Sequence, residues 1–334
     1  MSLPVNRETE NLAEWGDVLV ISPHLDDALL SAYEIIHRTG AEVWTVFAGE
    51  PDPPMTTDWD RTCGFPDSHT LMVRRRAEDI AACDVAGARY RHLNGLDGAY
   101  TDPPRRQRDL EQMSHDLLDW LGSRPGRRVT VVLPACAGTT VPPSLFDLVK
   151  RVRSPRASAS REASTHHTPP TDAADKQVAA SKETAAAPSS QPVTSPSPSL
   201  RDSLRHLAQE ALHREYQWRR HWALRKGWAV NNDHLAVRNA GLAVLANQPG
   251  IQIVLAEDLP YLWGAPADAE IARVARQHRW MVSPREFTVD RHGKHRAIAH
   301  YTSQLSVLEP SGRLSAADSL PTIERSWVLR SNTR

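Results

Sequence analysis

The chain has 334 residues, of which 40% are hydrophobic, and its formal net charge at neutral pH is +0. A neutral chain lacks the positive field that attracts nucleic acid or anionic membranes, so these are excluded as main partners and a small-molecule partner is expected. Cys63, Cys83 and Cys136 show no CxxC spacing and no apolar run reaches a membrane span, so we expect a cytoplasmic protein without membrane insertion, of unknown oligomeric state.

Short apolar runs alternate with longer helical segments over most of the chain, which is typical of an α/β protein. The predicted buried strands are residues 17–22, 42–48, 128–134 and 251–256. The predicted helices are residues 27–40, 69–87, 106–122 and 233–250. This order predicts a Rossmann-like, three-layer α/β/α fold with a mostly parallel sheet.

One segment interrupts this pattern between the third and fourth predicted strands. Residues 154–200 consist largely of Ser, Ala, Thr and Pro, with few large apolar side chains to offset chain entropy, so disorder is expected there. Residues 201–225 are predicted to form a basic helix that carries Trp side chains. Because the strand at 251–256 needs the first half's sheet to pair with, residues 1–334 are expected to form a single domain with this insertion.

Acidic and imidazole side chains follow the first predicted strand, in the sequence VLVISPHLDDALLS. In open α/β sheets, ligands bind at the carboxyl ends of the strands, which is where His24, Asp26 and Asp27 fall. An imidazole and a carboxylate suit a divalent ion such as zinc, and a further carboxylate can serve as a base. His24 and Asp27 fit the first role and Asp26 the second. The alternative is that Asp26 or Asp27 only caps the following helix.

A catalytic zinc site usually has three protein ligands and an open position for water. The segment NNDHLAVRNAGL offers His234 at the start of a predicted helix, with Asp233 beside it. His234 is therefore the candidate for the third ligand.

PHLDD after the first strand, followed later by DH at a helix start, resembles the PIG-L/LmbE family of zinc-dependent N-acetylglucosaminyl de-N-acetylases. Further segments match this pattern: RRAED, VLPACAG, AEDLPY and KHRAIAHYTSQL, at residues 75–79, 132–138, 256–261 and 294–305. The resemblance covers nearly the whole chain except the insertion. It implies that His24, Asp27 and His234 bind zinc and that Asp26 is the general base toward zinc-bound water. Fe²⁺ is another possible metal, because His and carboxylate ligands accept both ions.

One position departs from the family, which commonly has His three residues before the last ligand, where this chain has Asn231. The family His helps to polarise the carbonyl or to stabilise the tetrahedral intermediate. An Asn amide can donate a hydrogen bond to an oxyanion but cannot carry the charge of an imidazolium. We expect Asn231 to take that role with the amide alone. Asp233 is expected either to orient its neighbours or to cap the helix.

The resemblance suggests that Arg75 and the acidic residues Glu50 and Asp52 face the sugar. Arg75 could equally form a helix salt bridge with Glu78 or Asp79. The further rim candidates, for which solvated surface is the more common state, are Glu257, Asp258, Tyr261, Lys294 and Tyr301. The expected activity is removal of the acetyl group from an N-acetylglucosamine-type conjugate whose acceptor the sequence does not identify. The alternatives are an amidase acting on a thiol-sugar conjugate and a non-catalytic sugar-binding member of the family.

Overall fold

The computed structural model describes residues 12–139, residue 215 and residues 229–331. The described sheet and the helices that cover it belong to one compact unit of the chain. The predicted disordered insertion and the predicted helix at 201–225 lie outside the described residues, apart from Glu215.

The described part of the chain forms a seven-stranded sheet in the order β3-β2-β1-β4-β5-β7-β6. The strands are β1 (Asp17–Ser22), β2 (Glu42–Thr45), β3 (Arg89–His92), β4 (Val129–Pro134), β5 (Ile251–Ala256), β6 (Trp280–Thr288) and β7 (Ile323–Ser331). The first five in spatial order are parallel, whereas β7 runs antiparallel to β5 and β6 antiparallel to β7. β4 and β5 pair directly, so the segments before and after residues 140–228 share one sheet, and the predicted mostly parallel sheet is confirmed.

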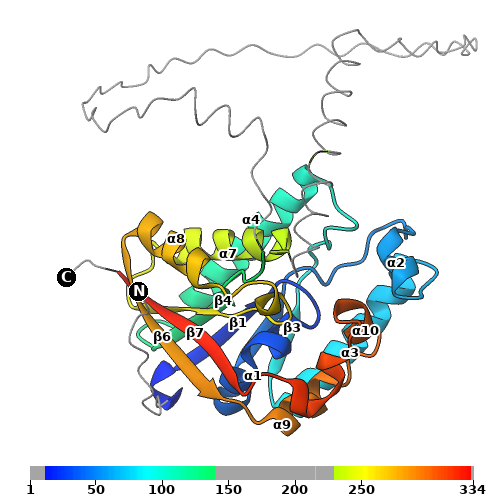
Figure 1. Ribbon diagram of the computed structural model, residues 1–334. Helices are drawn as coiled ribbons and strands as arrows, with labels where there is room; N and C mark the ends of the chain where they lie inside the picture. The colour runs from blue at the N-terminus through cyan, green and yellow to red at the C-terminus, as the bar shows by residue number, and fades with distance from the viewer. Residues whose placement is uncertain (1–11, 140–214, 216–228, 332–334) are drawn as a thin grey trace, which may run out of the picture. The chain divides into compact units, whose positions relative to one another are not determined.

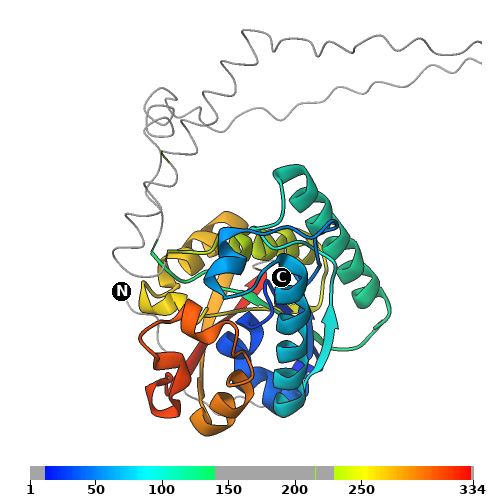
Figure 2. The same ribbon diagram turned by 90° about the vertical axis from the view of Figure 1, so that its right-hand side faces the viewer.

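Helices cover both faces of this sheet (Figures 1 and 2). They are α1 (Asp27–Thr39), α2 (Asp58–Thr62), α3 (Ser68–Ala86), α4 (Pro103–Gly122), α7 (Asn232–Leu245), α8 (Asp268–His278), α9 (Arg291–Ile298) and α10 (Leu305–Leu308). Short 3-10 turns lie at Leu12–Trp15, Tyr261–Trp263, Arg313–Ser315 and Ala317–Ser319. No helix among the described residues is both long and apolar enough to cross a membrane.

The alternation of side chains along β1 divides the core into two layers. Val18 and Val20 face a layer that includes side chains of α1, α3 and α9, whereas Leu19 and Ile21 face one that includes α4, α7 and α8. Because both faces are covered, the strand is apolar throughout, as expected for a central parallel strand.

The strand order changes direction between β1 and β4. The chain moves outward from β1 through β2 to β3, then returns to the other side of β1 as β4. Such a change of direction is where open α/β sheets bind ligands. On the β4 side, Gly241 lets α7 pack closely, since a Cβ there would lie only 2.8 Å from Cδ2 of Leu133.

Three strands (β3, β6 and β7) and four helices (α2, α8, α9 and α10) among the described residues were not predicted. β3 has the sequence RYRH and is mostly exposed, so it lacks the apolar run of a buried strand. β6 and β7 form the antiparallel end of the sheet, where the alternation of polar and apolar side chains is weak. These additions, with the four helices, extend the predicted fold without changing its class.

Candidate metal centre and active site

The turn between β1 and α1 is held by its own polar groups. Ser22 Oγ donates to the His24 carbonyl (2.7 Å) and accepts from the Ala28 amide (3.0 Å), which serves the start of the helix. The Asp26 side chain makes no capping hydrogen bond, although Asp26 precedes the first helical residue. Asp27 Oδ2 instead accepts from the backbone amide of His24 at 2.9 Å. Neither carboxylate is therefore used as a helix cap.

Three donor atoms converge beside this turn. Asp27 Oδ2 lies 2.9 Å from His24 Nδ1 and 3.0 Å from His234 Nε2, and all three side chains are buried. His234 Nε2 is buried, and its contact with Asp27 Oδ2 is an ion pair that lacks the geometry of a hydrogen bond. Two imidazoles and a carboxylate in one group are a donor set that zinc prefers, so these residues fit a divalent ion.

The remote nitrogen of each imidazole faces another carboxylate. His24 Nε2 lies 3.1 Å from Asp233 Oδ2, and His234 Nδ1 lies 2.6 Å from Asp258 Oδ1. A carboxylate on the remote ring nitrogen fixes the tautomer and the ring orientation of a metal-binding histidine. His24 Nδ1 and His234 Nε2 are thereby the ring nitrogens that could bind a metal ion.

In the absence of an ion, these contacts favour protonated imidazoles. Burial acts to lower the pKa of His234, but the Asp27 charge and the hydrogen bond to Asp258 outweigh it and raise this pKa to about 9. Burial likewise acts to lower the pKa of His24. The hydrogen bonds with Asp233 and Asp27 outweigh burial and raise this pKa well above its ordinary value. Burial acts to raise the pKa of Asp27, but His234 and His24 hold it well below its ordinary value. The site is therefore suited to cationic charge among its carboxylates.

Asp26 lies in a different electrostatic setting from its neighbour. Burial and repulsion from Asp27 raise the pKa of Asp26 to about 6, against the opposing charge of Arg75. Arg75 is also the side chain that Asp26 contacts, with Arg75 Nη2 lying 3.4 Å from Asp26 Oδ2. A carboxylate that titrates close to neutral pH is suited to accept a proton in one step and to return it in another.

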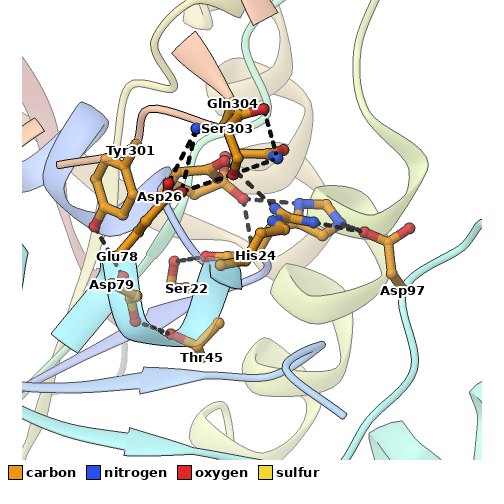
Figure 3. A network of polar contacts seen from close by, with 12 residues as sticks. Ser22, His24, Asp26, Thr45, Glu78, Asp79, Asp97, Tyr301, Ser303 and Gln304 are labelled. Carbon is orange, nitrogen blue, oxygen red and sulfur yellow. Dashed lines mark hydrogen bonds and ion pairs between the residues drawn. The ribbon is translucent and has the colours of Figure 1, made fainter. Parts of the chain in front are cut away.

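Arg75 faces the site and does not form the helix salt bridge that the sequence also allowed. Its Nη1 lies 3.6 Å from Asp97 Oδ2, and it is Arg74 whose Nε pairs with Glu78 at 2.8 Å. Figure 3 shows the wider network around Asp26 and His24, in which Glu78 and Asp79 bind the loop at 301–304. Glu78 and Asp79 are thus both occupied away from Arg75.

Asp97 was not predicted as a site residue. It lies in the loop after β3, and its Oδ2 is 3.7 Å from His24 Nε2. Because RYRH was not recognised as a strand, nothing placed this loop at the same sheet edge as His24. His24, Asp97 and Asp233 form a second possible donor group. The cations Arg75 and Arg106 lie on these two carboxylates, which makes that group less suited to a metal ion than the first.

The structure resolves the two roles considered for Asp233. Asn231 is the residue that caps α7, because its Oδ1 accepts from the Asp233 amide at 2.9 Å. The Asp233 carboxylate is bound by His24, by Arg106 and by the Gly98 amide. Asp233 therefore orients His24. Burial acts to raise the pKa of Asp233, but His24 and Arg106 outweigh it and hold this pKa well below its ordinary value.

The polar contacts of Glu50 are made with residues outside this group of donor atoms. Its Oε2 is 2.5 Å from His69 Nδ1, and its Oε1 pairs with Arg76. Both carboxylate oxygens are thus engaged by α3 side chains. The expected sugar contact of Glu50 remains a prediction.

The five rim candidates are not solvated surface groups. Asp258 is buried against His234, and Glu257 is buried with its Oε1 accepting from the Ala267 amide. Lys294 pairs with Glu324, Tyr301 donates to Asp79, and Tyr261 packs its ring edge on His234. The expectation of solvated surface was wrong because each of these side chains is engaged by a partner within the fold.

The fold is shared with deacetylases of known structure. A triple mutant of the deacetylase of the teicoplanin biosynthetic pathway is 20% identical with a TM-score of 0.55, covering 95% of this chain and 100% of that chain. The A40926 pseudoaglycone deacetylase Dbv21 is 22% identical with a TM-score of 0.52, covering 96% of this chain and 99% of that one. A zinc-inhibited form of teicoplanin deacetylase is 18% identical with a TM-score of 0.52, with 95% and 100% covered.

No family model and no curated protein matches the sequence. At these identities the structural similarity establishes a common fold. The activity of the chain is therefore inferred from the geometry of its site.

Proposed function

We propose that this protein is a zinc-dependent hydrolase that removes the N-acetyl group from an N-acetylglucosamine-type amino-sugar conjugate. The observation that carries the proposal is the group His24, Asp27 and His234, whose ligand atoms lie within 4.8 Å of one another, with the Asp26 carboxylate next to it in the chain. A metal-binding protein without turnover needs no base beside the metal, so this pairing favours hydrolysis.

His24 Nδ1, one Asp27 oxygen and His234 Nε2 would hold the ion. Zinc bound there, or Fe²⁺, would acidify water and polarise the acetamide carbonyl. Asp26, with its pKa raised to about 6 by burial and by Asp27, accepts a proton from the attacking water. It then delivers this proton to the amide nitrogen as the C–N bond breaks. Acetate and a free amino sugar are the products.

Arg75 and Asp97 supply a fixed cation and a fixed carboxylate beside Asp26 and His24. Such paired charges suit the hydroxyl groups of a sugar, which need both donors and acceptors. By name, one fold neighbour is a teicoplanin deacetylase and another an A40926 pseudoaglycone deacetylase, which supports a large acetylated conjugate as the substrate of this chain.

The test is metal content by mass spectrometry, followed by acetate release from a panel of N-acetylglucosamine conjugates. We expect one metal ion per chain in the parent, its loss in His234→Ala, and its retention in Asp26→Ala with loss of acetate release. Metal is supplied at one equivalent, because a fold neighbour has a zinc-inhibited form. A parent that binds no metal, or that retains it in His234→Ala, would contradict the proposal.

A further inference from the structure

The orientation of the Asn231 amide is fixed by its two neighbours. Its Oδ1 caps α7 by accepting from the Asp233 amide at 2.9 Å, a role that only an oxygen can perform. The other end of the amide must then be the NH₂ group, which lies 2.9 Å from Tyr261 Oη. Asn231 Nδ2 is therefore the donor in this bond and Tyr261 Oη the acceptor.

This assignment leaves the proton of Tyr261 available. Among the residues that the structure describes, no side chain or carbonyl accepts a hydrogen bond from the Tyr261 hydroxyl, although its oxygen is engaged by Asn231. A phenol is both a donor and an acceptor, so one hydrogen bond remains to be made. Asn231, by contrast, already commits one of its two Nδ2 hydrogens to Tyr261 and its Oδ1 to the cap of α7.

Tyr261 lies beside His234, one of the three residues of the metal-binding group. The Tyr261 ring meets the His234 ring edge-on, with centroids 5.0 Å apart. A phenol ordinarily has a pKa of about 10, so the Tyr261 hydroxyl keeps its proton throughout the neutral range. A half-buried phenol beside a ligand histidine is a neutral donor in a region of low dielectric.

We propose that Tyr261 is a catalytic residue that donates a hydrogen bond to the acetamide oxygen as this oxygen gains negative charge, and that Asn231 is the positioning residue that holds it there. This inference rests on the proposed function. It replaces the expectation that the Asn231 amide itself meets the oxyanion. No proton is transferred by Tyr261 in this role, since Asp26 carries the proton from water to nitrogen.

The competing explanation is that the Tyr261 hydroxyl only braces Asn231 and the end of α7. A brace would affect metal content and ground-state binding alike. A donor to the developing oxyanion would instead affect kcat and the affinity for a tetrahedral analogue, and would leave substrate binding nearly unchanged. These readouts separate the two explanations.

The experiment compares the metal-loaded parent with Tyr261→Phe, Asn231→Asp and the double variant, with Tyr90→Phe on the exposed strand β3 as the matched control. An Asp at 231 could still cap α7, but it would accept the Tyr261 proton instead of donating to the oxygen. For each protein we would measure the metal per chain and the kcat and KM for the hydrolysed conjugate. Calorimetry would give the affinity for N-acetylglucosamine and for a tetrahedral analogue, the methylphosphonamidate of glucosamine.

We expect Tyr261→Phe to keep its metal and its KM, and to lower kcat by about 10²- to 10³-fold, the usual loss on removal of one oxyanion donor. Its affinity should fall for the phosphonamidate alone. Asn231→Asp should lose a similar factor, and the double variant no more than Tyr261→Phe. A Tyr261→Phe variant as active as Tyr90→Phe would overturn the inference while the proposed function stands. A parent that hydrolyses no acetylated sugar would overturn both.

Discussion

Asp258 Oδ1 lies 2.6 Å from His234 Nδ1, while the other Asp258 oxygen accepts from the Ala137 amide at 3.0 Å. One carboxylate thus connects the segment after β5, the segment after β4 and the first turn of α7. The orientation of the His234 ring therefore depends on the register between β4 and β5, because a shift of one strand along the other would move Asp258 relative to the ring.

The first prediction concerns this carboxylate. In the parent, the Asp258 carboxylate orients the His234 ring and raises the basicity of this imidazole. Asp258→Asn keeps the shape of the side chain but weakens both effects. Zinc affinity should fall about 10- to 100-fold, the usual cost of losing such a partner. Competition with a chromophoric chelator measures it. The matched control is Asp268→Asn, on a surface ion pair with Arg325, and equal affinities in the two variants would contradict the prediction.

The second prediction is that metal binding releases protons at neutral pH. The pKa of His234 without metal is raised to about 9 by Asp27 and Asp258, which outweigh the opposing effect of burial. An ion must therefore displace a proton at any pH below about 9, and the affinity for zinc should rise with pH by about tenfold per unit for each proton displaced.

Calorimetric titrations with zinc in two buffers of different ionisation enthalpy measure the number of protons released. We expect at least one, since the pKa of His24 is also raised by Asp233 and Asp27 against burial. Identical apparent enthalpies in the two buffers would mean that the imidazoles are already neutral, and would contradict the prediction.

The sequence predicted the central residues of the site because their signal is local. His24, Asp26 and Asp27 follow an apolar strand within a few residues, and His234 begins a helix with clear periodicity. These residues lie close together because β1 and β4 are parallel neighbours, so the segments that follow the two strands are at the same edge of the sheet. The structure brings the predicted ligands together, as expected from the sequence.

The residues that support this group could not be predicted in the same way. Asp97 follows a strand without an apolar pattern, and Arg106 lies on a helix whose exposed face carries several arginines. Lys294 and Glu324 look like surface residues until the packing of α9 against α1 is known. Burial of a charge depends on its partner, and in this chain the partner is separated by many residues.

The third prediction concerns the pH dependence of the proposed reaction. Burial and Asp27 raise the pKa of Asp26, and the Arg75 charge opposes this shift. Asp26 must be ionised to act as a base, so kcat/KM should fall as the pH drops through its pKa. Arg75→Met removes the opposing charge, raises that pKa further and should move the acid limb to higher pH.

Arg75→Lys is the matched variant, because it retains the charge while altering the geometry. Its acid limb should stay nearer that of the parent, even where its KM has risen through loss of a sugar contact. The measurement is the full pH profile of kcat/KM for the three proteins. An acid limb in Arg75→Met at the parent's position would show that Arg75 does not tune Asp26.

The fourth prediction concerns the helix that carries Asp27. α1 is interrupted at Ala32, whose φ is −137° and ψ 31°. The freed Leu30 carbonyl accepts from Lys294 Nζ at 2.6 Å, and the amides of Tyr33 and Glu34 donate to the Glu324 carboxylate. Lys294 Nζ also lies 2.7 Å from Glu324 Oε1, and both side chains are buried.

Lys294→Met should therefore lower the free energy of unfolding by about 3–5 kcal/mol, because it leaves the Glu324 charge buried without its cation. Adding Glu324→Gln removes that charge and should recover most of the loss, although Leu30 still lacks its donor. Arg291→Met is the control, three residues earlier on α9 and paired with the exposed Asp318, and should cost less than about 1 kcal/mol. Urea unfolding of the four proteins measures these differences. If the double variant were less stable than Lys294→Met, the cost would lie in the hydrogen bonds of Glu324 to α1, and the unpaired charge would not be its cause.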